Sequence, residues 1–223
     1  MTGKIYSYPD NYRVWKALVA AAYNQVDVEL PAFDMAKGAH KTEAFLQKNP
    51  LGKVPVLETP HGCLFESGAI ARYVARLRAD ANLLGASNFQ QGQVDQWIDF
   101  CTNELEPARS IWLYPILGYQ TFNDKANQEA KKEMTNALTV LNQHLLRNTY
   151  LVGNAVTLAD IVIVTALVDL YRLVFAPEFI AQFPNVTRWF TTCINQPEFA
   201  KVIGKVEFAK AEAQPPKADK NEA

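Results

Sequence analysis

The chain has 223 residues, of which 49% are hydrophobic and 20% are charged, and its formal net charge is −1 at pH 7. This length is sufficient for one large domain or two small ones, and the apolar fraction is sufficient for a sizeable core. Acidic and basic residues are interspersed, so we expect no direct binding of nucleic acid or of an anionic membrane.

The N-terminal sequence and the pattern of cysteines indicate the cellular compartment. No apolar run approaches the roughly 18 residues of a transmembrane helix, and MTGKIYSYPDNYR lacks the apolar block of a signal peptide. Cys63, Cys101 and Cys193 are far apart, and the sequence has no CxxC and no His/Cys cluster. We therefore predict a cytoplasmic protein with reduced thiols and no metal site, in which each cysteine is a small buried side chain.

Strand and helix patterns alternate over residues 1–82. The patterns typical of strands are KIYSY (4–8), VDVEL (26–30), VPVLE (54–58) and CLFE (63–66), and those typical of helices cover 11–24, 40–49 and 67–77. The order β-α-β-α-β-β-α predicts one mixed sheet, made of a parallel βαβ unit and a hairpin that turns at TPHG. This is the outline of a thioredoxin-like α/β domain.

Residues 88–208 contain helical patterns only. These patterns cover 89–105, 127–146, 156–174 and 185–194. Residues 156–174 are apolar almost all round, which is typical of the central helix of a bundle. Pro107 and Pro115 interrupt a helical pattern and predict a kink or break. Residues 209–223 have no aromatic or β-branched side chain, so we predict a disordered linker or tail.

Pro55 follows Val54 in an apparent strand, where proline is costly because it cannot donate to the ladder. A proline at the start of an edge strand is the ordinary explanation. The alternative is a cis Val54–Pro55 bond, which would turn the chain and leave the Val54 backbone free to pair with an extended peptide ligand. We predict the cis bond from the context of the motif.

Glu66 and Ser67 open a helical pattern, and the pair has two interpretations. Ser67 is suited to a plain N-cap that satisfies one free amide of the helix. The same helix N-terminus is also suited to a ligand carboxylate, to which Ser67 would donate while Glu66 pairs with an ammonium group. The second arrangement fits the zwitterionic end of a γ-glutamyl peptide such as glutathione.

The segment VTLADI, residues 156–161, predicts the start of the most buried helix. Thr157 and Asp160 have the spacing of a capping box, and Val156 and Ile161 have that of a hydrophobic staple. This signal is structural and carries no catalytic role.

These motifs resemble the glutathione transferase superfamily, through NPLGKVPVLE and FESGAIARYVA in the first half and LVGNAVTLADI in the second. The resemblance covers about residues 3–208 and implies a glutathione transferase fold, with a thioredoxin-like N-terminal domain and an all-α C-terminal domain. YSYPDNYRVWKALVAA and FPNVTRWFTTCINQPEF further resemble one branch, the gamma subunits of eukaryotic elongation factor 1. In that branch a lysine-rich linker and a separate domain follow this region.

The resemblance implies a glutathione site. The residues that match the family's pattern are Lys53, Val54, Pro55, Glu66 and Ser67. In many members a basic residue or a histidine after the second strand assists, and His40 or Lys41 is the candidate here.

The group that would activate the glutathione thiol stays unassigned. Members of the family place a Tyr, Ser or Cys after the first strand, where it stabilises the thiolate and lowers its pKa. The loop YSYPDNYR does not match that spacing, and the candidates in it are Ser7, Tyr8 and Asn11, with Tyr6 a further hydroxyl. Asp10 would oppose a thiolate. We therefore expect low or absent conjugating activity.

A pocket for an electrophile is less clearly marked. Arg109, Trp112, Tyr114 and Tyr119 either line a cleft between the two halves or serve as packing residues. The first three are also the candidates for anchoring a protein partner.

The resemblance leads to two functions from different classes. One is a scaffold domain of the gamma subunit that anchors the guanine-nucleotide exchange subunit of elongation factor 1, alone or with a second copy of the chain. The other is a theta-like glutathione transferase that conjugates glutathione to small electrophiles. Because fold does not decide function, both remain open at this point.

Overall fold

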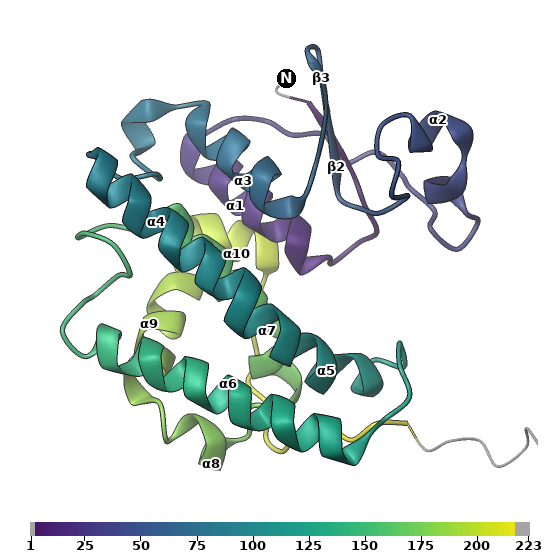
Figure 1. The fold of residues 1–223 in the computed structure, drawn as a ribbon. Coiled ribbons are helices and arrows are strands. Elements are labelled where there is room, and N and C mark those ends of the chain that lie inside the picture. The colour runs from purple at the N-terminus through teal and green to yellow at the C-terminus, as the bar shows by residue number, and fades with distance from the viewer. Residues whose placement is uncertain (1–2, 217–223) are drawn as a thin grey trace, which may run out of the picture.

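The computed structural model describes residues 3–216, which form an α/β half and a larger helical half (Figure 1). The first half contains β1 (Lys4–Tyr6), α1 (Tyr12–Asn24), α2 (Glu43–Leu46), β2 (Val56–Thr59), β3 (Gly62–Phe65) and α3 (Ser67–Arg76). The helices of the second half are α4 (Asn88–Phe100), α5 (Glu106–Ile116), α6 (Asp124–Leu145), α7 (Leu158–Leu173), α8 (Pro177–Ile180), α9 (Pro184–Ile194) and α10 (Pro197–Ile203). The predicted fold class is confirmed.

The sheet has three strands in the order β1-β2-β3, and both pairings are antiparallel. Ile5 lies opposite Leu57, which in turn lies opposite Leu64. The predicted strand at 26–30 is reduced to one parallel bridge, in which the Glu29 carbonyl accepts from the Ile5 N–H at 2.8 Å. The predicted four-stranded sheet is therefore wrong within the described residues, since Pro31 follows directly and has no N–H with which to extend the ladder.

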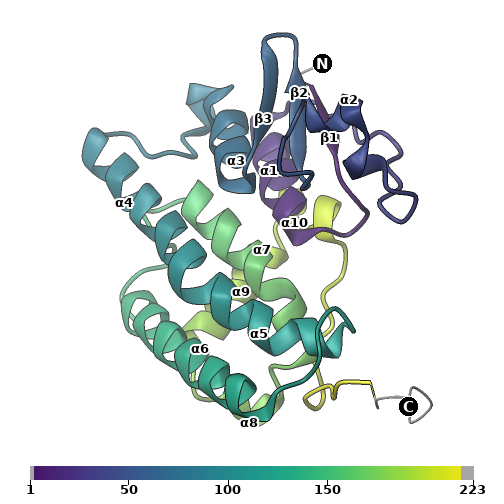
Figure 2. The same cartoon turned by 45° about the vertical axis from the view of Figure 1, so that its right-hand side comes forward.

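Helix α1 joins the two halves. Asn11 caps it by accepting a hydrogen bond from the Arg13 N–H at 3.0 Å. The helix packs against α3 on one side and α7 on the other, so a single apolar core runs through both halves (Figure 2). Three of its alanines, Ala17, Ala20 and Ala21, are almost fully buried and permit this close approach on more than one face.

The predicted kink near Pro107 takes the form of a π turn. Residues Cys101–Leu105 form this turn between α4 and α5. Pro107 lies in the first turn of α5 and has no N–H to donate to the preceding turn, so the backbone widens where an α-helical bond is missing. The π turn leads directly into α5, which contributes Glu106 and Tyr114 to the groove between the two halves.

Helix α7 lies in the middle of the helical half, against α1, α4 and α9 (Figure 2). The predicted capping box at its start is confirmed. One oxygen of Asp160 accepts from the N–H and the hydroxyl of Thr157 at 2.9 and 3.0 Å. The other accepts from the Leu151 N–H and the Trp189 indole, both at 2.9 Å. The buried carboxylate therefore ties α7, α9 and the preceding loop together.

Residues 209–216 differ from the predicted disordered tail because the helical half binds them. The N–H groups of Ala209 and Ala213 donate to the carbonyls of Tyr171 and Leu173 at 2.7 and 2.8 Å. The carboxylate of Glu212 accepts from the Trp112 indole at 2.9 Å. These polar contacts hold a segment that has little apolar surface to bury. The rest of the predicted tail, 217–223, lies outside the described residues.

Over residues 3–216, every helix is too short or too polar to cross a bilayer.

Asp160→Asn should lower the free energy of unfolding by roughly 2–4 kcal/mol, because the amide nitrogen would face N–H and O–H donors. Urea denaturation measures the change. The control is Asp124→Asn, an exposed residue in the first turn of α6, whose expected effect is within about 0.5 kcal/mol. Equal effects of the two substitutions would contradict the role given to Asp160.

Candidate functional site

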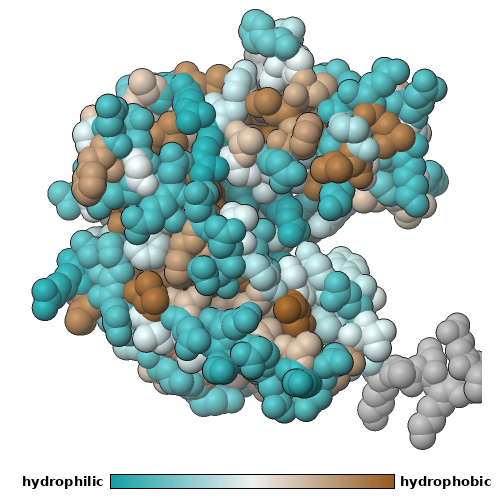
Figure 3. Space-filling view, viewed as in Figure 1, coloured by the Kyte–Doolittle hydropathy of each residue, from teal (hydrophilic) through white to brown (hydrophobic). Residues whose placement is uncertain are grey.

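A groove of about 810 Å³ lies between the two halves. One wall comes from the loops and α3 of the first half, and the other comes from α1, α4 and α5. In the space-filling view the molecule is hollowed on its right-hand side, between the upper α/β half and the lower helical half (Figure 3).

The structure brings the sequence-predicted binding residues together. Those that line the groove are His40, Lys53, Val54, Pro55, Glu66 and Ser67. The Val54–Pro55 bond is cis, as predicted. Upstream, the side-chain amide of the buried Asn49 donates to the Lys53 carbonyl at 2.8 Å and so fixes the loop. The alternative basic residue, Lys41, is not part of the lining.

The start of α3 is open toward the groove. Glu66 occupies the N-cap position, and its side chain makes no capping hydrogen bond. Ser67 is the first helical residue, so the plain N-cap role considered for it is wrong. A helix N-terminus without a side-chain cap offers free N–H groups and a partial positive charge to an anion.

Glu66 has φ of 68°, in the left-handed region that a non-glycine residue rarely adopts. Such a conformation costs on the order of 1–3 kcal/mol, and residues of this kind cluster at ligand sites. At Glu66 this backbone conformation occurs beside an acidic side chain and free amides, at one end of the groove.

His40 lies on the same wall. Its Nδ1 is buried, and within residues 3–216 it has no hydrogen-bond partner. A buried polar atom of this kind costs free energy unless a water or a ligand satisfies it.

Two of the three candidates for thiol activation lie outside the groove. The Asn11 amide donates to the Ser7 hydroxyl at 3.0 Å, and its oxygen accepts from the Arg13 N–H. Neither Ser7 nor Asn11 lines the groove, whereas Tyr8 does. Burial raises the pKa of the Tyr8 phenol, which makes it a poorer proton donor to a thiolate.

Three of the four residues predicted for an electrophile pocket line a cavity between the two halves. Arg109 and Trp112 are each 2% exposed and do not line the groove. Tyr114 lines the groove, and Arg109, Tyr114 and the 67% exposed Tyr119 line a second cavity of about 420 Å³ beside residues 8–13. The packing interpretation therefore holds for Trp112, whereas Arg109, although buried, lines the second cavity.

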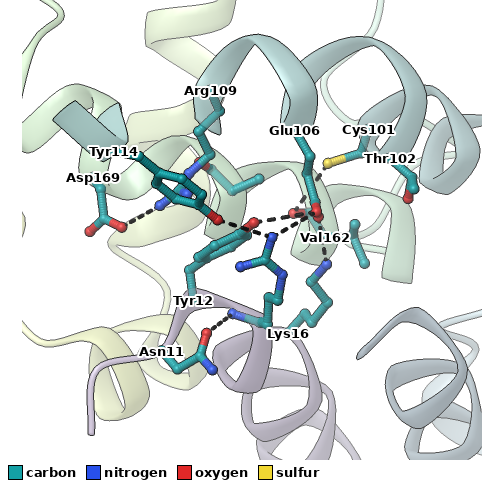
Figure 4. Close-up of polar contacts among 12 residues, drawn as sticks. Asn11, Tyr12, Lys16, Cys101, Thr102, Glu106, Arg109, Tyr114, Val162 and Asp169 are labelled. Carbon is teal, nitrogen blue, oxygen red and sulfur yellow. Dashed lines mark hydrogen bonds and ion pairs between the residues drawn. The ribbon is translucent and has the colours of Figure 1, made fainter. Parts of the chain in front are cut away.

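A charged network at the base of the groove was missed by sequence reasoning (Figure 4). Glu106 of α5 accepts from Lys16 of α1 at 3.0 Å and from the Tyr12 hydroxyl at 3.3 Å. The Arg13 guanidinium lies 3.7 Å from the same carboxylate and 3.5 Å from the Tyr114 hydroxyl. No local spacing marks these pairs, because the partners are 90 or more residues apart in sequence.

The network lowers the pKa of two groups, Glu106 and Tyr114. Burial alone would raise the pKa of Glu106, but the ammonium of Lys16 outweighs it and the pKa lies below its ordinary value. Burial would likewise raise the pKa of the Tyr114 phenol, but the hydrogen bond with Ser110 and the Arg13 charge outweigh it, so that this pKa is lowered. The base of the groove therefore favours negative charge.

Two family models match the chain. The glutathione S-transferase N-terminal domain matches residues 1–76, and the glutathione S-transferase C-terminal domain matches residues 105–197. The chain belongs to the glutathione S-transferase family. The groove thus lies where the two family domains meet.

This member of the family is similar to elongation factor 1-gamma-B of Xenopus laevis, with 44% identity over 218 residues, 95% of this chain and 49% of the relative. The chain spans about half the length of the curated relatives it matches. The transferase-like domain of elongation factor 1-gamma from Saccharomyces cerevisiae has a TM-score of 0.81 and 25% identity, over 97% of this chain and 99% of that one. A glutathione S-transferase-I bound with lactoylglutathione also has a TM-score of 0.81 and 25% identity, over 91% and 99%.

Glu106→Gln tests the network. Because the pKa of Glu106 is lowered on folding, its carboxylate stabilises the fold above the unfolded-state pKa, and this contribution is lost as the pH falls through the folded-state pKa. The substitution should cost about 3 kcal/mol near neutral pH, since Lys16 would keep an unpaired buried charge.

The difference between Glu106→Gln and the unchanged chain should shrink on acidification, as followed by urea denaturation at a series of pH values. Glu133→Gln, at an exposed position of α6, is the matched control and should have little effect at any pH. A cost of Glu106→Gln that stays constant into acid would contradict the pairing.

Proposed function

We propose that this chain acts in translation elongation, in the cytoplasm, as the transferase-like domain of an elongation factor 1 gamma subunit that holds the guanine-nucleotide exchange subunit. The observation that carries the proposal is the 44% identity to elongation factor 1-gamma-B of Xenopus laevis, over 218 residues. The similarity to the Saccharomyces cerevisiae domain extends over both halves as well. The near-zero net charge also favours a protein partner over nucleic acid.

A stable partner needs an interface that buries roughly 1,200 Å² or more in total. Arg109 and Trp112, two of the three anchors suggested by the sequence, are buried and unsuited to this role. Exposed apolar side chains on the outer helices are better suited: Phe89 on α4 is 77% exposed, and Val140 and Leu146 on and just after α6 are 49% and 66% exposed. We assign the docking surface to the parts of α4 and α6 that carry these three side chains.

A second candidate function, glutathione binding with or without transfer to an electrophile, has its own support in the groove. The open start of α3, the acidic Glu66 and the Val54 backbone match the three polar groups of an extended γ-glutamyl peptide. The unpartnered Nδ1 of His40 provides a further polar contact. Because Ser7 and Asn11 do not line the groove, we expect conjugation to be slow.

Co-purification tests the assembly role against the enzymatic one. Mixed at micromolar concentration, the 223-residue chain and the N-terminal region of the exchange subunit should elute as one complex in size-exclusion chromatography. Turnover of glutathione with an aromatic electrophile should fall below the range of about 1–1000 per second that is typical of enzymes.

Phe89→Asp should weaken this complex if α4 is part of the docking surface, and Phe122→Asp, at a 44% exposed position before α6, is the control. A chain that elutes apart from the exchange subunit, together with turnover in the enzymatic range, would replace the assembly role with the transferase role.

A further inference from the structure

The sheet has an outer edge with unpaired backbone groups. Glu29 donates to the Gly3 carbonyl at 3.0 Å and accepts from the Ile5 N–H at 2.8 Å, so both of its backbone groups face β1. Because the backbone groups of successive residues in a strand face opposite edges, those of Val28 and Leu30 face outward. Among the described residues, these outward N–H and C=O groups have no hydrogen-bond partner. The edge can therefore pair with a further strand.

Pro31 does not block this edge. Its backbone faces back toward β1, where the missing N–H limits the ladder. Ala32, the next residue, faces outward again, and its N–H and C=O are unpaired within residues 3–216. Residues 30–34 contain neither a helix nor a turn. Val28, Leu30 and Ala32 thus present three outward positions at the two-residue spacing of a strand.

The far end of the edge is held in place by the fold. The Ala39 N–H donates to the Asp34 carbonyl at 3.1 Å. The Phe33 ring packs against the rings of Tyr6 and Phe45, at centroid distances of 5.8 and 4.9 Å. An edge that is already fixed loses little conformational entropy when a peptide pairs with it.

A cavity of about 990 Å³ opens beside this edge. Helix α1 contributes Val14, Trp15 and Leu18 to the cavity, whereas it contributes Arg13 and Lys16 to the glutathione groove, so the two sites lie on different faces of the helix. Further apolar side chains in the lining are those of Leu30, Pro31, Phe33, Met35 and Val202. Such a lining is suited to apolar side chains of a strand that pairs with the edge.

The charges at the cavity favour a basic ligand. Over the described part of the chain, the lining contains the carboxylates of Asp10 and Asp34 and no Lys, Arg or His. Lys37, outside the lining, opposes Asp34 at 3.4 Å. Asp10 is exposed and has no ion-pair partner in residues 3–216. One negative charge therefore remains free to pair with a cation.

We propose that an extended, basic peptide segment of a protein partner adds to the outer edge of residues 28–32 as a further β-strand. Its backbone pairs with Leu30 and Ala32, its apolar side chains at alternate positions enter the cavity, and a lysine or arginine lies beside Asp10. The site uses neither Glu66 and Ser67 of the groove nor the exposed side chains of α4 and α6. It therefore adds a second protein contact to the assembly role proposed above.

Peptide titration tests this assignment. The probes are capped heptapeptides of the pattern K-T-Φ-T-Φ-T-K, in which Φ is Val, Leu or Phe and the two lysines serve either strand direction. In amide NMR spectra of the 223-residue chain, at least one probe should move the N–H signals of Val28, Leu30 and Ala32. The hydrogen exchange of these three amides should slow, while the signal of Gly153, in the loop before α7, should stay in place.

Changes to the peptide backbone test strand pairing with the protein unaltered. Only every second amide of an added strand faces the edge. N-methylation of one alternate set of peptide amides should therefore abolish binding, and N-methylation of the other set should preserve it.

Ala32→Pro makes the same test from the protein side. It removes an outward N–H and should weaken the probe about tenfold or more. Ala36→Pro is the matched control and should leave binding unchanged. Ala36 is the second residue of a turn in which the Gly38 N–H donates to the Met35 carbonyl at 3.0 Å, a position that favours proline.

Asp10→Asn tests the charge. Asparagine tolerates the left-handed conformation that Asp10 adopts, with φ of 56°, so the backbone should be preserved. The substitution should weaken the lysine probes about two- to fivefold at low salt, as expected for an exposed ion pair. It should leave unchanged the affinity of a probe with Thr in place of both lysines.

Four results would overturn the assignment. Probes that leave the three amide signals unmoved at millimolar concentration reject the edge as a binding site. Equal effects of the two N-methylation patterns reject strand pairing. Lysine probes that bind Asp10→Asn as tightly as the unchanged chain reject the basic partner. Butylamine that binds as tightly as the probes would make the cavity a site for small amines. None of these results bears on glutathione binding or on the complex with the exchange subunit.

Discussion

The structure depends on how Glu106, a carboxylate at the boundary of the two halves, is neutralised. An unpaired charge in such a place would cost several kcal/mol. Lys16 pairs with it at 3.0 Å, and Tyr12 donates to it from the same helix, α1. Buried pairs of this kind add little net stability, but they tolerate few alternative arrangements. The relative position of α1 and α5, and with it the width of the groove, is therefore closely specified.

The two halves contribute different features to the groove. The first half contributes the Val54 edge and the open amides of α3, together with the unfavourable backbone conformation of Glu66. The helical half contributes rigidity through the four hydrogen bonds of Asp160, and it lines the groove with Glu106 and Tyr114 of α5. The glutathione groove and the outer docking surface that we propose use different residues of the same fold, so one chain can combine both roles.

The features that were predicted correctly are those that depend on residues close together in the sequence. The cis bond at Pro55, the helix that opens at Ser67 and the capping box at Asp160 all follow from neighbours within a few residues. The strand at 26–30 was overestimated, because alternation alone does not show that Pro31 limits the ladder. The Lys16–Glu106 network could not be predicted, since it joins residues 90 positions apart and exists only once the halves are packed. For the same reason, residues 209–216 were assigned to a tail, because their order depends on groups such as Trp112 in the folded helical half.

For the groove, the central proposal is that it binds the γ-glutamyl end of glutathione at the start of α3. Amide NMR spectra of the 223-residue chain, titrated with glutathione, test it most directly. The account predicts that the N–H signals of Val54, Ser67 and Gly68 move together, while that of Gly153, in the loop before α7, stays in place. It also predicts that Glu66→Ala abolishes these shifts and that Glu43→Ala, at an exposed acidic residue of α2, preserves them. Unmoved signals at millimolar glutathione, or shifts confined to residues outside the groove, would contradict it.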